Sequence, residues 1–204
     1  MKRNKQIIFI LLAVMGVFML AGCKEEKVTE NTADAEAEYP TPFAQIDIEG
    51  YGTITVQLDP SQAPITVENF IDLAGSGFYD GLTFHRIIDG FMIQGGDPEG
   101  NGTGGADHEI KGEFAINGVN NNISHVRGVI SMARSQNPDS ASSQFFIVQK
   151  DSKFLDGQYA GFGYVTEGIE IVDQICKDAH PIDENGTILP QDQPVIKEIK
   201  IYYE

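Results

Sequence analysis

The chain has 204 residues, of which 41% are hydrophobic and 22% charged, so it is long enough for one folded domain with a substantial core. Its net charge is −16; without the three basic residues that precede Cys23, 11 basic and 30 acidic residues remain, a net of −19. Phosphate backbones repel such an acidic surface, so the composition argues against nucleic-acid binding.

The first 22 residues have the three parts of an export signal. A basic start is followed by an apolar run from Ile7 to Leu20 and by small residues before Cys23. The run is shorter than the roughly 20 residues that a membrane-spanning helix needs, although a retained transmembrane anchor is the alternative. Leu20 to Cys23 resembles the bacterial lipobox. We therefore expect residues 1–22 to be a lipoprotein signal peptide and Cys23 to carry diacylglycerol and fatty acids such as palmitate.

Residues 23–42 form the next predicted segment, which begins at the lipidated Cys23. From Lys24 to Pro42 the chain contains six acidic residues, two lysines and few side chains to bury. Such a composition does not offset the entropy cost of ordering the chain. We expect a disordered acidic tether that holds a folded domain away from the membrane.

Residues 43–204 carry the patterns of a folded domain. Period-two alternation predicts strands over 44–48 and 54–58, and an apolar stripe predicts a helix that opens at Pro64. Further short apolar runs with glycine-rich connections predict the remaining elements. The expected fold is mainly β, a closed eight-stranded antiparallel β-barrel with two α-helices. The other predicted elements are strands near 83–88, 91–95, 128–133, 144–149, 161–165 and 195–203, and a helix over 169–176.

Four other features of the sequence give no evidence of a reaction. Gly100 to Gly105 matches G-x-G-x-x-G, but no helical stripe follows it, so we interpret it as a surface loop and not a dinucleotide site. The four histidines lack close ligand spacing, so we predict neither a metal nor another cofactor. No G-x-S-x-G elbow marks a serine nucleophile. Cys176 falls on a helical apolar stripe, where we expect it to pack in the core rather than pair with Cys23.

The stretch FHRIIDGFMIQGGD combines a cation with apolar residues and an amide. Alternation places Phe84, Arg86 and Ile88 on one face of a strand, and the two glycines after Gln94 remove side-chain bulk. The segment SQFFIV again places a glutamine beside two phenylalanines. The pattern fits two structures equally well. One is an apolar pocket with a cation pointing into it, and the other is a barrel core with an arginine at its rim.

Four segments resemble, in order, the motifs of the cyclophilin-type peptidyl-prolyl isomerases. The resemblance covers about Phe43 to Glu204 and implies an eight-stranded antiparallel barrel capped by two helices, in agreement with the strand pattern. It also implies an enzyme that rotates X–Pro peptide bonds in proline-containing polypeptides. The four segments are FHRIIDGFMIQGGD (84–97), GVISMA (128–133), SQFFIV (143–148) and FLDGQYAGFG (154–163).

The same resemblance implies the site residues. The family's catalytic arginine falls on Arg86, with Gln94 and Gln144 as its polar partners. The predicted catalytic residues are Arg86, Gln94 and Phe91. The predicted substrate-binding residues are Met92, Ala133, Gln144, Phe146, Phe154, Leu155 and Tyr159.

The chain departs from the family pattern at three positions. Arg134 replaces a common asparagine and changes the charge beside the peptide-binding Ala133. Phe154 replaces the tryptophan of many eukaryotic members, and Tyr159 replaces a histidine; both are similar to the bacterial branch of the family. We interpret His85 as a support for its strand rather than a chemical group.

We therefore predict a monomeric, lipid-anchored prolyl isomerase that assists the folding of exported proteins at the outer face of the cell membrane. Two alternatives remain. A non-catalytic binding module on the same fold would not need the cation of Arg86. A solute-binding lipoprotein would share the signal and tether, but it would be longer and two-lobed, with alternating helices and strands.

Overall fold

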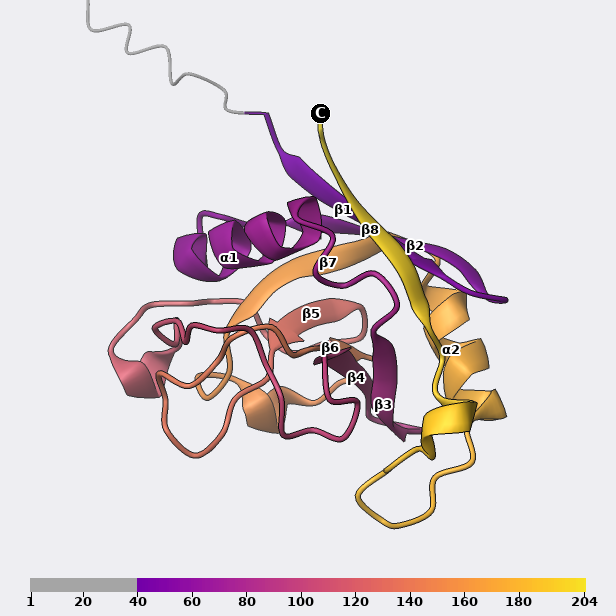
Figure 1. Ribbon diagram of the computed structural model, residues 1–204. Helices are drawn as coiled ribbons and strands as arrows, with labels where there is room; N and C mark the ends of the chain where they lie inside the picture. Colours follow the sequence, from indigo (N-terminus) through magenta and orange to yellow (C-terminus); the bar gives the residue numbers. More distant parts are fainter. Residues whose placement is uncertain (1–39) are drawn as a thin grey trace, which may run out of the picture. The chain divides into compact units, whose positions relative to one another are not determined.

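The computed structural model describes residues 40–204 (Figure 1). The predicted signal peptide, the lipid site at Cys23 and the tether up to residue 39 lie outside the described residues. Eight strands form one antiparallel sheet in the order β3-β4-β6-β5-β7-β2-β1-β8. The strands are β1 (Pro42–Ile48), β2 (Gly52–Leu58), β3 (Thr83–Ile88), β4 (Met92–Asp97), β5 (Val129–Met132), β6 (Phe145–Val148), β7 (Gly161–Glu167) and β8 (Ile196–Tyr203). The helices are α1 (Pro64–Gly75) and α2 (Ile169–Asp178).

The strand prediction is confirmed, but the predicted closure of the barrel is too strong. The sheet curls until its two edge strands, β3 and β8, approach each other. They meet through one isolated bridge, Thr83 to Val195, and through flanking backbone hydrogen bonds such as that from Ile196 N–H to the Leu82 carbonyl at 2.7 Å. A continuous ladder does not join them. The fold is therefore a curled half-barrel with a short seam.

The two predicted helices are confirmed, and they lie at different ends of the curled sheet in Figure 1. In α1, Phe70 packs against Phe145 and Phe162 at centroid distances of 5.5 and 5.2 Å, which joins the helix to the aromatic core. The buried Glu113 carboxylate accepts hydrogen bonds from the first backbone N–H groups of α1. In α2, Cys176 is buried in the core as expected, and burial raises the pKa of its thiol to about 12.

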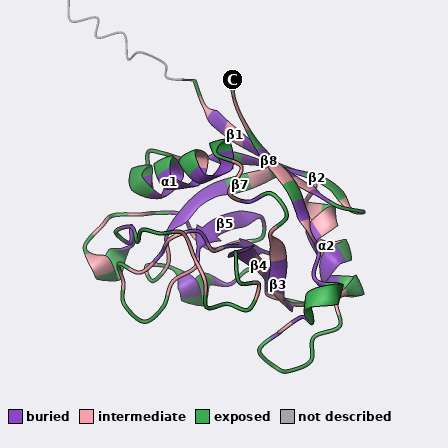
Figure 2. Cartoon of the chain, in the orientation of Figure 1, coloured by how far each residue is buried: buried purple, intermediate pink, exposed green. Residues whose placement is uncertain are grey.

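Buried residues follow the strands, whereas exposed residues gather on the loops and on the outer sides of the helices (Figure 2). The buried hydrophobic residues form two clusters. The main core fills the curl of the sheet, and a smaller cluster packs beside it around Met92, Val129 and Phe146. Within residues 40–204, neither helix has the length and apolarity needed to cross a membrane. The smaller cluster matters for function because several predicted site residues belong to it.

One expectation about strand β3 is wrong. Phe84, Arg86 and Ile88 do not share a face, because the register between β3 and β4 shifts on both sides of Phe84. Phe84 joins Ile87 in the main core, whereas Ile88 packs on the smaller cluster. The β-bulge changes the alternation at His85 and turns Arg86 away from the main core.

Candidate active site

Two segments hold Arg86: the loop after α2, through the Asn185 carbonyl, and strand β4, through Gln94. Its Nε–H donates to the Asn185 carbonyl at 2.7 Å, and its Nη1 donates to Gln94 Oε1 at 3.1 Å. Nη1 also lies 3.9 Å from the Met92 sulfur. Partial burial lowers the pKa of Arg86, yet arginine stays charged at neutral pH because its ordinary pKa is above 12. Within residues 40–204, Nη2 makes no protein hydrogen bond, so it is available to a bound molecule.

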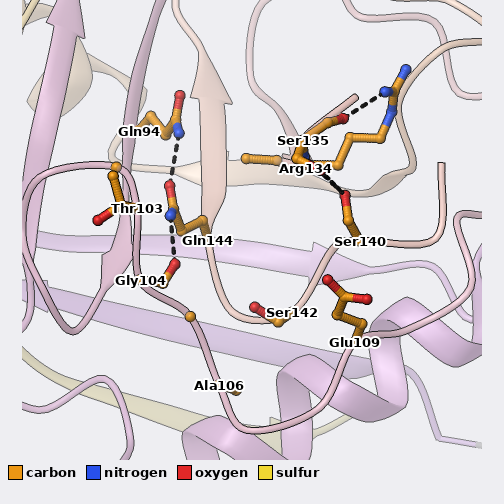
Figure 3. Close-up of a pocket in the computed structure, with 13 residues that line it drawn as sticks. Gln94, Thr103, Gly104, Ala106, Glu109, Arg134, Ser135, Ser140, Ser142 and Gln144 are labelled. Atoms are coloured by element: carbon orange, nitrogen blue, oxygen red, sulfur yellow. Dashed lines mark hydrogen bonds between the residues drawn. The ribbon is translucent and has the colours of Figure 1, made fainter. Parts of the chain in front are cut away.

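A chain of amides fixes the orientation of Arg86, and the part of it that follows Gln94 is drawn in Figure 3. Gln94 Nε2 donates to Gln144 Oε1 at 2.9 Å, and Gln144 Nε2 donates to the Gly104 carbonyl at 2.7 Å. Each amide therefore presents its oxygen toward the arginine side of the chain and its N–H groups toward the loop. This order leaves Gln94 Oε1 as the acceptor for Arg86. Of the two glutamines predicted as polar partners, Gln94 bonds Arg86 directly and Gln144 bonds Gln94.

The two glycines after Gln94 are required by close packing, as the sequence suggested. A Cβ atom at Gly95 would lie 2.6 Å from the Thr83 carbonyl oxygen, and one at Gly96 would lie 2.6 Å from the Ser143 carbonyl oxygen. Gly96 also has φ +81°, which side-chain-bearing residues rarely adopt. These glycines let β4 approach its neighbours and so bring Gln94 to Gln144.

Eight predicted site residues line one cavity of about 170 Å³. Its floor is apolar: Met92 and Phe146 are buried, with 1% and 5% of their surface exposed. Tyr159 meets Phe146 edge-on, with centroids 5.8 Å apart. The cavity also has Arg134 in its lining, and it has the size and apolar floor to hold a small ring beside the Arg86 guanidinium. The eight residues are Arg86, Phe91, Met92, Gln94, Ala133, Phe146, Leu155 and Tyr159.

Phe154 lies at the rim of this cavity and not in its lining. Its side chain is 65% exposed, and its ring lies 5.6 Å from that of Phe91. The structure thus separates it from the five predicted substrate-binding residues that line the cavity, whereas Gln144 lines the adjoining polar cavity. It extends the apolar surface outward from the cavity.

Arg134, which lies beside Ala133, is held in place by hydrogen bonds and by two aromatic rings. Its Nε and Nη2 donate to the Gln158 carbonyl at 3.0 and 2.8 Å, and Nη1 donates to the Ser135 carbonyl at 2.9 Å (Figure 3). The guanidinium also lies over the rings of Phe114 and Tyr159, 5.0 and 4.7 Å from their centroids. Arg134 therefore ties the Tyr159 loop to the end of β5.

A second, polar cavity of about 340 Å³ adjoins the first and is shown in Figure 3. The two share Gln94, Ala133 and Arg134. The glycine-rich loop at 102–105, part of the predicted surface loop, forms one wall. Its role in the site was missed, as was the Asn185 carbonyl. The density of glycines was the one available signal, since it allows backbone groups to face a cavity.

Two buried histidines flank the site. His85 is 4% exposed and His125 is fully buried, and burial lowers the pKa of both below the ordinary value of about 6.5. Charge partly opposes this: Asp97 raises the pKa of His85, and Asp156 raises that of His125. Within residues 40–204, no group of three or more metal-binding side chains is placed to hold a metal ion.

These shifts predict a pH-dependent stability. Since the folded-state pKa lies below the unfolded value, the unfolded chain binds more protons as the pH falls through 6.5. We expect the free energy of unfolding in urea to be lower at pH 5.5 than at pH 7.5. Replacing both His85 and His125 by Gln should reduce that difference, whereas replacing the exposed His108 and His180 should not. Equal stability of the wild type at the two pH values would contradict the prediction.

Comparison with known proteins shows the family of this chain. Residues 43–202 match the profile of the family described as cyclophilin type peptidyl-prolyl cis-trans isomerase/CLD. A peptidyl-prolyl cis-trans isomerase of Helicobacter pylori is 47% identical over 126 residues, which cover 61% of this chain and 75% of the relative. Peptidyl-prolyl cis-trans isomerase B of Bacillus subtilis is 47% identical over 123 residues, covering 60% of this chain and 82% of the relative.

A solved structure gives the same result for the fold. The cyclophilin type peptidyl-prolyl cis-trans isomerase of Cryptosporidium parvum aligns with a TM-score of 0.70 and 32% identity, covering 80% of this chain and 99% of that one. A second structure of that protein, determined in the presence of the dipeptide Ala-Pro, aligns with a TM-score of 0.69 and the same identity, covering 79% of this chain and 99% of that one.

Proposed function

Since the chain belongs to the cyclophilin-type peptidyl-prolyl cis-trans isomerases, we propose that Arg86 is the group that accelerates rotation of the X–Pro bond in its substrates. The isomerase activity itself follows from the family. The observation that carries the assignment of Arg86 is its position at the edge of an apolar cavity. Its guanidinium is held on two sides, and Nη2 has no hydrogen-bond partner among residues 40–204.

The reaction needs a donor and no nucleophile. Amide resonance gives the X–Pro bond its barrier of about 18–20 kcal/mol. When the bond twists, resonance is lost and the prolyl nitrogen regains a lone pair that accepts a hydrogen bond. The Arg86 guanidinium would donate that bond while Phe146 and Met92 hold the prolyl ring. The Gln94–Gln144 relay would keep the guanidinium oriented before the substrate arrives.

The magnitudes favour a contact specific to the twisted bond. Uncatalysed exchange takes roughly 10–100 s. Exchange in milliseconds requires the rate to rise by a factor of about 10⁴ to 10⁵, which corresponds to lowering the activation barrier by about 5–7 kcal/mol. Burial of the ring stabilises the planar and twisted states alike, so it improves binding without lowering the barrier. A hydrogen bond that strengthens only as the nitrogen pyramidalises lowers the barrier itself.

The preoriented cation of Arg86 also argues against the alternative function, a binding module without catalytic activity. Such a module would need the apolar cavity but not a preoriented cation beside it. A protease-coupled isomerisation assay on residues 40–204, with a proline-containing peptide, tests the activity directly. Catalysis that disappears in Arg86→Ala supports the proposal, and equal catalysis by the two proteins contradicts it.

The rim residue Phe154 predicts reduced sensitivity to cyclosporin. In the family, a tryptophan at this position helps to hold that cyclic peptide through its indole N–H, and phenylalanine has no such donor. We expect Phe154→Trp to bind cyclosporin more tightly than the wild type in a fluorescence or calorimetric titration. Phe154→Tyr serves as a comparison that keeps the six-membered ring and adds a phenolic O–H, but not the indole N–H. Equal affinity of wild type and Phe154→Trp would remove the argument.

We further propose that the enzyme acts outside the cytoplasm as a lipid-anchored monomer that assists folding of exported proteins. The short apolar run before Leu20-Ala21-Gly22-Cys23 and the acidic segment after it support an anchored domain on a tether. The net charge of −16 suits a solvated surface, since it limits self-association. The clients would be polypeptides that contain proline and have not yet folded.

The anchor gives its own prediction. Cys23→Ala should abolish lipidation, because the thiol that receives the diacylglycerol is lost, and the protein should leave the membrane fraction. Intact-mass spectrometry of the mature protein measures both the lipid and the cleavage before Cys23. An unmodified Cys23, or a mature chain that retains residues 1–22, would contradict the prediction.

A further inference from the structure

A buried hydrogen-bonded network lies beside the ring cavity and is not used by the proposed mechanism. His125 Nδ1 lies 3.0 Å from Asp156 Oδ1, and His125 Nε2 lies 2.9 Å from Ser131 Oγ. A carboxylate only accepts, so Nδ1 carries the proton, and in the neutral ring Nε2 accepts from the Ser131 hydroxyl. Every polar atom of the imidazole therefore has a partner.

The order of these groups is that of a Ser-His-Asp hydrolytic triad, but their burial excludes that use. The Ser131 and His125 side chains are both fully buried. A nucleophilic serine must reach a substrate carbonyl, and Ser131 lies inside the sheet, on β5 directly opposite Phe146 of β6. Any effect of the network on the cavity must therefore pass through the residues in contact with His125.

The imidazole touches the floor of the ring cavity. His125 stacks on Phe146, with a centroid distance of 6.1 Å and an angle of 20° between the rings. Phe146 in turn meets Tyr159 edge-on at 5.8 Å. Because side chains in a close-packed interior interdigitate with little free space, the position of the imidazole limits the orientations open to the Phe146 ring.

His125 also fixes the segment that carries Leu155. Its backbone N–H donates to Asp156 Oδ1 at 2.7 Å, and its carbonyl accepts from Ser152 N–H at 2.7 Å. Asp156 follows Leu155 directly in the chain. The segment from Ser152 to Asp156 is thereby fastened at both ends to the loop before β5.

We propose that His125 is a positioning residue of the isomerase, which sets both the Phe146 ring and the Leu155 segment in the lining of the cavity that holds the prolyl ring. This rests on the proposed function of that cavity. Ser131 and Asp156 fix the plane of the imidazole. The imidazole in turn sets the position of the Phe146 ring. The effect is on substrate affinity, since the network does not contact Arg86.

The test compares three variants of the full domain. His125→Phe keeps a flat ring against Phe146 but loses both side-chain hydrogen bonds. His125→Gln keeps an acceptor for Ser131 and is the conservative variant. Ser124→Ala removes a hydrogen bond from the same Asp156 without touching the imidazole, and is the matched control. Peptide affinity and the exchange rate of the bound peptide are measured separately by NMR on an Ala-Pro peptide.

We expect His125→Phe to weaken peptide affinity about fivefold to tenfold while the exchange rate of bound peptide changes less than threefold. His125→Gln should recover part of the affinity, and Ser124→Ala should match the wild type. The proposal is overturned if His125→Phe binds as tightly as wild type, if Ser124→Ala shows the same loss, or if neither His125 variant folds. An exchange rate unaffected by Arg86→Ala would instead overturn the proposed function, so the two failures are distinguishable.

Discussion

Phe146→Ala should weaken binding of an Ala-Pro peptide by roughly tenfold to 100-fold. The Phe146 ring is 5% exposed and forms the floor of the cavity, so its removal leaves the prolyl ring without an apolar surface worth about 1.5–3 kcal/mol. The exchange rate of the peptide once bound should change much less, because the ring contacts planar and twisted states alike. Titration by NMR or calorimetry measures the affinity.

The neighbouring phenylalanine provides a matched control. Phe145 lies next to Phe146 on β6 but faces the main core, where it packs against Phe70 and Phe84. Both Phe145→Leu and Phe146→Leu remove a buried ring and should lower the free energy of unfolding by about 1–2 kcal/mol. Only Phe146→Leu should weaken the peptide. If the two variants bind the peptide equally, the cavity does not hold the prolyl ring.

Arg86→Ala should lower the catalytic rate by about two to three decades, or about 3–4 kcal/mol, as the loss of one preoriented donor typically does. Peptide affinity should fall much less, since the hydrogen bond to the prolyl nitrogen forms only as resonance breaks. The catalytic efficiency and the affinity are measured by the protease-coupled assay and by titration.

The charge-preserving variant separates geometry from charge. Arg86→Lys keeps a cation but loses the planar fork that bonds Asn185 and Gln94 at the same time. We expect it to recover less than a tenth of the lost rate. Recovery to the wild-type rate would show that a point charge is enough, and the role assigned to the Gln94–Gln144 relay would be wrong.

The sequence predicted the elements well because each one carries a local signal. β1 alternates buried and partly exposed residues as a half-buried strand should, and α1 opens at Pro64 with an apolar stripe. The site residues were found through four motifs whose order resembles that of a family. Composition and periodicity alone left Arg86 equally compatible with a pocket and with a barrel rim.

The features that sequence analysis missed depend on distant parts of the chain. The bulge at His85 arises from the pairing of β3 with β4, where Gly95 admits the backbone of Thr83 and Phe84. The Asn185 carbonyl that holds Arg86 is a backbone group, so its side chain gives no signal. The same holds for the stacking of His125 on Phe146, since only the folded sheet brings the two rings together.

The most direct test of the central claim is the exchange rate of an Ala-Pro peptide bound to Arg86→Ala, measured by NMR line shapes at saturating peptide. This rate reports the barrier of the bound peptide and is independent of affinity. The account predicts a folded variant that binds the peptide with nearly wild-type affinity and exchanges it 100-fold to 1,000-fold more slowly. A folded Arg86→Ala that exchanges the bound peptide at the wild-type rate would contradict it and leave Arg86 as a charge at the barrel rim.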